Sequence, residues 1–259
     1  MVPTTYTVFI ATFTVGLACL LVAGLSYAAA AHRQTGEPSL RATVTIGAAI
    51  VFGWLVAIVL LAREGAFASS PDRRVPGVLF GIGLPVALGW VLLARWSAAR
   101  RLVERVPLPW LMGVQLYRVV GAVFLFAFAQ DLIPGEFALP AGLGDVAIGL
   151  AAPVVAYALL RRGERARRAA VTWNVLGIAD LVVAVSMGFL TSPSPLQQLA
   201  LDAPNVLTSR YPFALIPEFA VPVSILLHLL SLRRLRQEQH KVSVGRAAGT
   251  RPGVVSYGE

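Results

Sequence analysis

Four ionisable residues interrupt the apolar second half of this 259-residue chain: Arg118, Asp145, Asp180 and Glu218. Each lies several residues inside a long stretch of apolar side chains, where an unpaired charge is costly. One arginine and three carboxylates could hold a cation or relay a proton. Two of the aspartates, if they face each other, could instead cleave a peptide bond. If all four ionise, the set carries a formal excess of −2. Either one or two acids then keep a proton, or an outside cation joins them.

Two neutral side chains and two further acids belong to the same hypothesis. Gln115 and Asn174 lie on the helical stripes of the arginine and of Asp180, so we expect them to line the site. Asp131 and Glu136 lie in a connecting segment without basic residues and would form a negative outer vestibule. Small residues beside the charges would let these helices approach closely.

The composition predicts which elements position these residues. Hydrophobic residues make up 57% of the chain and charged residues 14%, which is typical of a polytopic membrane protein. Stretches of about 20 apolar residues are long enough to cross a bilayer as helices. Seven occur: 6–31, 43–62, 75–94, 108–129, 138–160, 170–190 and 212–232. We therefore expect an all-α bundle of seven transmembrane helices as one domain, 1–238, followed by a disordered basic tail, 239–259.

The basic residues predict the orientation of the bundle. If the N-terminus is outside, 17 of the 22 basic residues are cytoplasmic and four are external, with Arg118 left over. The cytoplasmic ones are Arg33, Arg41, Arg95, Arg100, Arg101, Arg105, Arg161, Arg162, Arg165, Arg167, Arg168, Arg233, Arg234, Arg236, Lys241, Arg246 and Arg251. This asymmetry predicts an external N-terminus and a cytoplasmic C-terminus. It also explains the net charge of +9 without a nucleic-acid partner; the lipid bilayer is the expected partner.

Counting along the predicted spans places the charges at similar depths. Arg118 and Asp180 each lie ten residues in from the inner face, about 15 Å deep. Asp145 and Glu218 enter from the outer face and lie about one turn further out. All four residues should converge, with Arg118 pairing mainly with Asp180. The first three spans carry few polar residues and are expected to be scaffold.

The sequence contains few residues that could bind a cofactor. A retinal Schiff base needs an intramembrane lysine, and Lys241 is the only lysine. One cysteine and three histidines give no pattern for a metal or haem, so we expect neither metal nor cofactor. His228 is expected to be a helix-end polar contact, with Ser224 as a neighbour one turn earlier. Leu196, Leu199 and Ala200 predict a short amphipathic helix on the outer surface.

One short motif indicates an enzyme. The run Gly142-Leu143-Gly144-Asp145 matches the Gly-x-Gly-Asp signature of intramembrane aspartyl proteases, and Asp180 could supply the second carboxylate. In those families the other aspartate comes earlier in the chain and a Pro-Ala-Leu motif follows. Here Asp180 comes later and no Pro-Ala-Leu exists. The protease interpretation is therefore weaker than the interpretation as a binding site.

A set of landmarks recurs through the second half of the chain: Gln115 to Arg118, Phe137-Ala138-Leu139-Pro140-Ala141-Gly142 with Gly144-Asp145, Trp173-Asn174 with Gly177 and Asp180, then Pro217, Pro222 and Leu227-His228-Leu229. With these landmarks the chain resembles a family of small, uncharacterised bacterial integral membrane proteins. The resemblance implies a seven-helix fold without an assigned activity, and we expect a multi-pass protein of the bacterial cytoplasmic membrane. We expect binding, transport or sensing of a proton, cation or small polar solute; the alternatives are an intramembrane enzyme and a structural or partner-stabilising protein.

Overall fold

The computed structural model describes residues 2–31, 39–72 and 77–249, and within them the chain forms helices and connecting turns without a strand. Six helical segments of the described chain are long and apolar enough to cross a membrane. One of them, Gly135–Thr191, consists of two helices joined by a short 3-10 turn, so it covers two predicted spans. The all-α architecture is therefore confirmed.

The observed helices overlap the seven expected stretches, but the fourth stretch is divided into three helical segments and the last is displaced toward the C-terminus. Their bounds are α1 Thr4–Ala30, α2 Ser39–Arg63, α3 Gly77–Arg95, α4 Ser97–Arg105, α5 Leu108–Gly113, the 3-10 helix η2 Val114–Gly121, α6 Ala122–Phe128, α7 Gly135–Arg162, η3 Gly163–Ala166, α8 Arg167–Thr191, the π-helix η4 Ile216–Ala220 and α9 Val221–Gly249. The turn between α7 and α8 requires Gly163, because its φ of 50° is unfavourable for residues with a Cβ.

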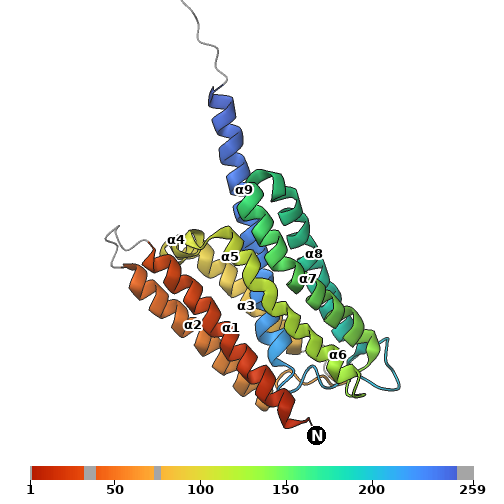
Figure 1. Cartoon of the computed structure of the whole chain (residues 1–259). Helices are drawn as coiled ribbons and strands as arrows, with labels where there is room; N and C mark the ends of the chain where they lie inside the picture. The colour runs from red at the N-terminus through yellow and green to blue at the C-terminus, as the bar shows by residue number, and fades with distance from the viewer. Residues whose placement is uncertain (1, 32–38, 73–76, 250–259) are drawn as a thin grey trace, which may run out of the picture.

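The helices form two groups on either side of α9 (Figure 1). Helices α1 and α2 pack together on one side, while α7 packs against η2, α5, α6 and α8 on the other. Helix α9 contacts α3, α5 and α8, and the π-helix η4 just before it contacts α1 and α2, so the η4–α9 segment connects the groups. Glycine permits several close approaches, as where the Trp110 ring occupies the space beside Gly24. The buried core therefore runs along α9, α7 and the α5–η2–α6 segment.

Helix α4 is an element that the sequence did not predict. Its nine residues carry several arginines, and so the segment was interpreted as a charged connection. In the structure Ala99 and Leu102 are buried, three residues apart on one face, and the helix packs against α1, α2 and α3. The amphipathic pattern of so short a helix is difficult to recognise in the sequence when most of its residues are charged or small.

The segment between α8 and η4 is not helical, so the predicted amphipathic helix there is wrong. Leu196 and Leu199 are exposed within an irregular loop. Pro193 and Pro195 remove two backbone donors, and Ala200 has a φ of 53°, which no α-helix contains. The loop is instead tied to the end of α8 by polar contacts.

The C-terminal helix extends further than predicted. Helix α9 continues to Gly249, so residues 239–249 of the expected disordered tail are helical. The physical reason is that a formed helix can propagate without a new nucleus, and no proline follows Pro222 before residue 252. Residues 250–259 lie outside the described chain, as do Arg33, Arg73 and Arg74 of the charge count.

Candidate functional site

Arg118 is held by an unusual helical segment. Residues Val114–Gly121 form a 3-10 helix of eight residues between α5 and α6, longer than most such helices. Side chains three residues apart eclipse in this geometry, which places Gln115, Arg118 and Gly121 on one buried face. This face packs against α7. The arginine is therefore directed into the bundle, and only 2% of its surface is exposed.

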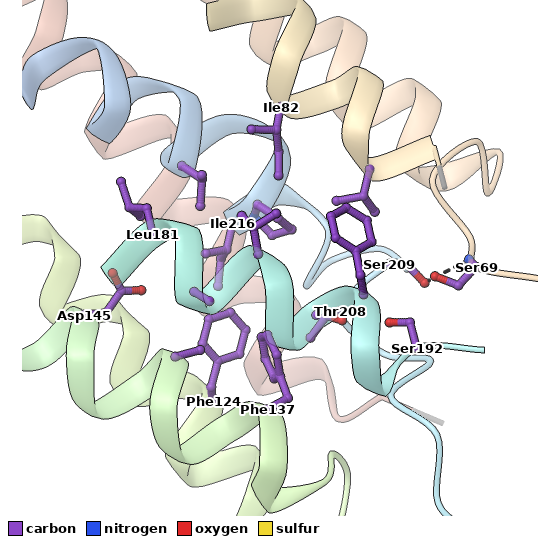
Figure 2. A pocket seen from close by; sticks show the side chains of 18 residues that line it. Ser69, Ile82, Phe124, Phe137, Asp145, Leu181, Ser192, Thr208, Ser209 and Ile216 are labelled. Atoms are coloured by element: carbon purple, nitrogen blue, oxygen red, sulfur yellow. Dashed lines mark hydrogen bonds between the residues drawn. The ribbon is translucent and has the colours of Figure 1, made fainter. Parts of the chain in front are cut away.

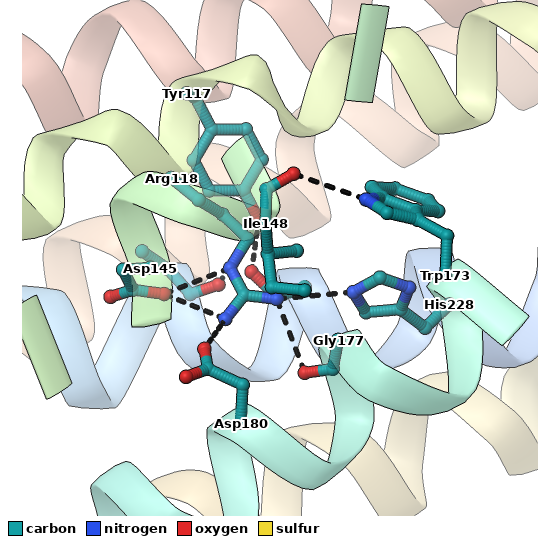
Figure 3. A network of polar contacts seen from close by, with 10 residues as sticks. Tyr117, Arg118, Asp145, Ile148, Trp173, Gly177, Asp180 and His228 are labelled. Atoms are coloured by element: carbon teal, nitrogen blue, oxygen red, sulfur yellow. Dashed lines mark hydrogen bonds and ion pairs between the residues drawn. The ribbon is translucent and has the colours of Figure 1, made fainter. Parts of the chain in front are cut away.

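The guanidinium group is surrounded by polar partners within the protein (Figure 3). Its Nε donates to Asp145 Oδ1 at 2.8 Å, and Nη2 lies 2.7 Å from the same oxygen. Nη2 also donates to Asp180 Oδ2, and Nη1 donates to the Gly177 carbonyl at 3.2 Å. The last contact is Nη1 to His228 Nε2, also at 3.2 Å. Four of these contacts are hydrogen bonds and the second contact with Asp145 is an ion pair, so at least four of the five N–H bonds of the arginine are directed at the protein.

The contact with arginine fixes the tautomer of His228. A guanidinium can only donate, so Nε2 of the imidazole must accept and the ring proton resides on Nδ1. Nδ1 then donates to Asn174 Oδ1 at 2.9 Å. The ring also packs against Trp173, with centroids 5.0 Å apart. His228 is thus a neutral member of the network, and the expected Ser224 contact is absent because Ser224 pairs with Tyr117 at 2.6 Å.

Glycines make room for the charged groups on neighbouring helices. A Cβ on Gly121 would overlap the Asp145 side chain, and one on Gly144 would overlap Asp180 Oδ1. Likewise, a Cβ on Gly177 would overlap the His228 ring. The predicted close approach of small-residue stripes agrees with these contacts.

Arg118 binds both aspartates, rather than mainly Asp180 as expected. The sequence-based depth assumed a rise of about 1.5 Å per residue, but a 3-10 helix rises about 2.0 Å. Over the four residues from Val114 to Arg118 the difference is about 2 Å, directed toward the predicted outer side. That shift moves the arginine toward Asp145, which makes two of the contacts.

The same geometry explains the Gly-Leu-Gly-Asp sequence without proteolysis. Gly142 packs against Leu125 and Gly144 against Asp180, while Leu143 is exposed on the outer surface of α7. An aspartyl dyad requires two carboxyls that share a proton. Here the arginine lies between Asp145 and Asp180 and donates to both. Helix packing thus accounts for both glycines of the motif.

The other predicted site residues do not bond to the network. Gln115 is fully buried on the same helix face as Arg118, and neither of its amide atoms has a hydrogen-bond partner. Glu218 is buried in η4 against Gly81 of α3, and its oxygens make no hydrogen bond, so the expected convergence of four charges is limited to Arg118, Asp145 and Asp180. Asp131 and Glu136 are both exposed, at the turn before α7 and in its first turn.

A cavity of about 60 Å³ leads from Asp145 to the loops at one end of the bundle (Figure 2). Apolar side chains from α3, α6, α7, α8 and α9 form most of its wall, including Phe124, Phe137 and Leu181. Ser69, Ser192, Thr208 and Ser209 lie at the opposite end from the aspartate. Their hydroxyls lie in loops without a motif, so the sequence did not identify them. Helix α3 is more than scaffold, since Val78 and Ile82 line this cavity.

Comparison with known proteins places the chain in a family. A family described as a domain of unknown function, DUF8737, matches residues 75–236. The chain belongs to this family. The DUF8737 match includes every residue of the Arg118 network and all residues of the cavity wall except Ser69. No curated protein and no solved structure matches the chain.

Proposed function

We propose that this DUF8737 protein is an integral membrane protein whose helices span a bacterial cytoplasmic membrane, with the N-terminus outside. Six long apolar segments support insertion, and large apolar side chains such as Val8, Leu60, Val154 and Leu160 are exposed on the outer surfaces of the helices. In water such a surface would drive aggregation, whereas lipid would cover it. The asymmetry of basic residues supports the orientation.

The ligand that this site fits best is a proton or a small cation. Arg118 is buried and directs four hydrogen bonds and a further ion-pair contact at groups of the protein, so it offers little to an anion. Two carboxylates face this one cation and His228 is neutral, which leaves a net charge of −1 when both acids are ionised. The observation that carries the proposal is this surplus carboxylate at the end of a cavity.

Asp145 is the residue through which we expect binding. It lines the cavity, and only its Oδ1 accepts hydrogen bonds from the described residues. A volume of about 60 Å³ holds a few water molecules, which suits a proton or an inorganic ion more than a larger solute. The hydroxyls at the outer end of the cavity could replace part of the hydration shell of an entering ion.

Proteoliposomes that enclose a pH-sensitive dye test the proposal. When acid, Na⁺ or K⁺ is added outside vesicles that contain the wild-type protein, we expect the pH inside the vesicles to change. Vesicles that contain Asp145→Asn should lose this response. Asp202→Asn is the control, because Asp202 is exposed and belongs neither to the network nor to the predicted vestibule. The thermal midpoint of unfolding in detergent, measured against pH, Na⁺ and K⁺, reports binding without transport. Equal responses of wild type and Asp145→Asn in both measurements would refute the proposal.

A structural role has one specific observation in its favour. The guanidinium binds groups on α7, α8 and α9 at once, so it could serve solely to fix these helices. In that case Asp145→Asn should change stability but neither the ion response nor its pH dependence. The two measurements above therefore distinguish an ion site from a structural ion pair.

A further inference from the structure

Glu218 is a buried acid that the Arg118 network does not use. Its side chain has no exposed surface, and neither carboxylate oxygen has a hydrogen-bond partner. Burying an ionised carboxylate without a partner costs far more than burying the neutral acid, because the charge loses its hydration and gains no compensating contact. The geometry alone therefore requires the acid to carry its proton.

The residues that contact the Glu218 carboxyl group in the described chain are apolar. A Cβ on Gly81 of α3 would overlap the carboxyl group, and the Phe67 ring contacts the same position. The neighbouring residue Phe219 packs on Trp54 of α2, with ring centroids 4.6 Å apart. The carboxyl thus occupies a seam between η4 and α3 that exists because residue 81 has no side chain.

The charged and titratable groups on the elements that pack against η4 have other partners or lie at a distance. Tyr6 of α1 packs on Phe213, and Arg63 of α2 lies over the Tyr211 ring. Arg95 ends α3 well beyond Gly81, and His228 of α9 binds Asn174. None of these forms a hydrogen bond or an ion pair with the glutamate within the described chain.

The helical geometry connects this seam to the cavity. Glu218 lies in a π-helical turn, a feature frequent at functional sites. Its neighbours Pro217 and Val221 line the cavity, so the glutamate lies beside the cavity-facing side of the same turn. Conversion of the π-turn to an α-turn would remove the extra residue and rotate the side chains on one side of it by about one residue, roughly 100° in an α-helix.

We propose that Glu218 is a second proton-binding site, distinct from the Arg118 network, which holds its proton against Gly81 and exchanges it with the cavity through the π-turn. This site does not rest on ion binding at Asp145. The bound species is a proton, since among the described residues the seam holds one carboxyl and no second ligand for a metal. The exchange is a simple acid dissociation, in which the O–H bond breaks and water in the cavity accepts the proton.

Infrared spectroscopy of the full chain in lipid tests protonation directly. At about pH 7.5 a water-exposed glutamate is ionised. We expect the spectrum of wild type minus Glu218→Gln to contain the carbonyl band of a protonated carboxylic acid. The control Glu136→Gln should leave that band unchanged, because Glu136 is exposed. A difference spectrum with carboxylate bands instead would overturn the proposal.

Two further measurements keep the test decisive. If Glu218→Gln does not fold, wild type that carries ¹³C-carboxyl glutamate should still show an isotope-shifted acid band, because Glu218 is the buried glutamate of the described chain. Transfer into D₂O tests the exchange. The band should shift to the deuterated-acid position in the folded protein, whereas a band that stays unshifted until unfolding would refute the link with the cavity.

Discussion

Replacement of Arg118 by methionine should be among the most destabilising changes in this protein. The substitution keeps most of the apolar length of the side chain but removes a cation that contacts two carboxylates, one imidazole and one carbonyl. Breaking a buried ion pair from one side costs about 3–5 kcal/mol, because the remaining charge is left uncompensated. We expect a loss in this range for Arg118→Met.

The triple variant Arg118→Met, Asp145→Asn, Asp180→Asn separates the cost of stranded charge from the value of the network. It removes the cation and both anions, so no buried charge remains unpaired. We expect its loss of unfolding free energy to be less than half that of Arg118→Met. Coupling of this size is the sign of groups that act as one unit.

Equilibrium unfolding in mixed micelles of increasing dodecyl sulfate, followed by fluorescence of the five tryptophans, measures both losses. Arg161→Met is the matched control, since Arg161 is exposed and its side-chain contacts within the described chain are with Tyr157. Its effect should remain within about 0.5 kcal/mol. A triple variant that loses as much stability as Arg118→Met would refute the reasoning.

Two other predictions concern packing and orientation. Gly144→Ala should cost about 1–3 kcal/mol in the same unfolding assay, because the added methyl group overlaps the Asp180 carboxylate, whereas Gly83→Ala, in open space, should be neutral or slightly stabilising; equal effects would contradict the packing argument. For orientation, a reporter fused after Arg236 should be active only in the cytoplasm and one inserted near Gly135 only outside, and the reverse pattern would invert the proposed topology.

Much of the helical architecture could be predicted from hydropathy, because an apolar stretch of about 20 residues has few alternatives to a helix. The partners of Arg118 were also accessible, since a buried arginine requires an acid and few acids lie at its depth. Asp145 and Asp180 both contact it as a result.

The details that sequence reasoning missed depend on local helix geometry. A 3-10 segment around Arg118 and a π-turn at Glu218 change rise and rotation by amounts that hydropathy does not encode. The first shifted the arginine toward Asp145, and the second accompanies a glutamate directed at α3. The Nδ1–H tautomer of His228 was equally inaccessible, because it follows from two contacts that are distant in sequence.

The order of synthesis gives the Arg118–Asp145 contact a further meaning. The arginine leaves the ribosome 27 residues before its first carboxylate partner. If the chain spans a bilayer as proposed, an isolated α5–η2–α6 segment would enter lipid with an unpaired cation, at a cost of about 2.5–3.5 kcal/mol. Insertion together with α7 as a helical hairpin avoids that cost, since the turn between them is short and α7 brings Asp145 alongside. The ion pair would thus couple two helices during biogenesis, before the rest of the bundle exists.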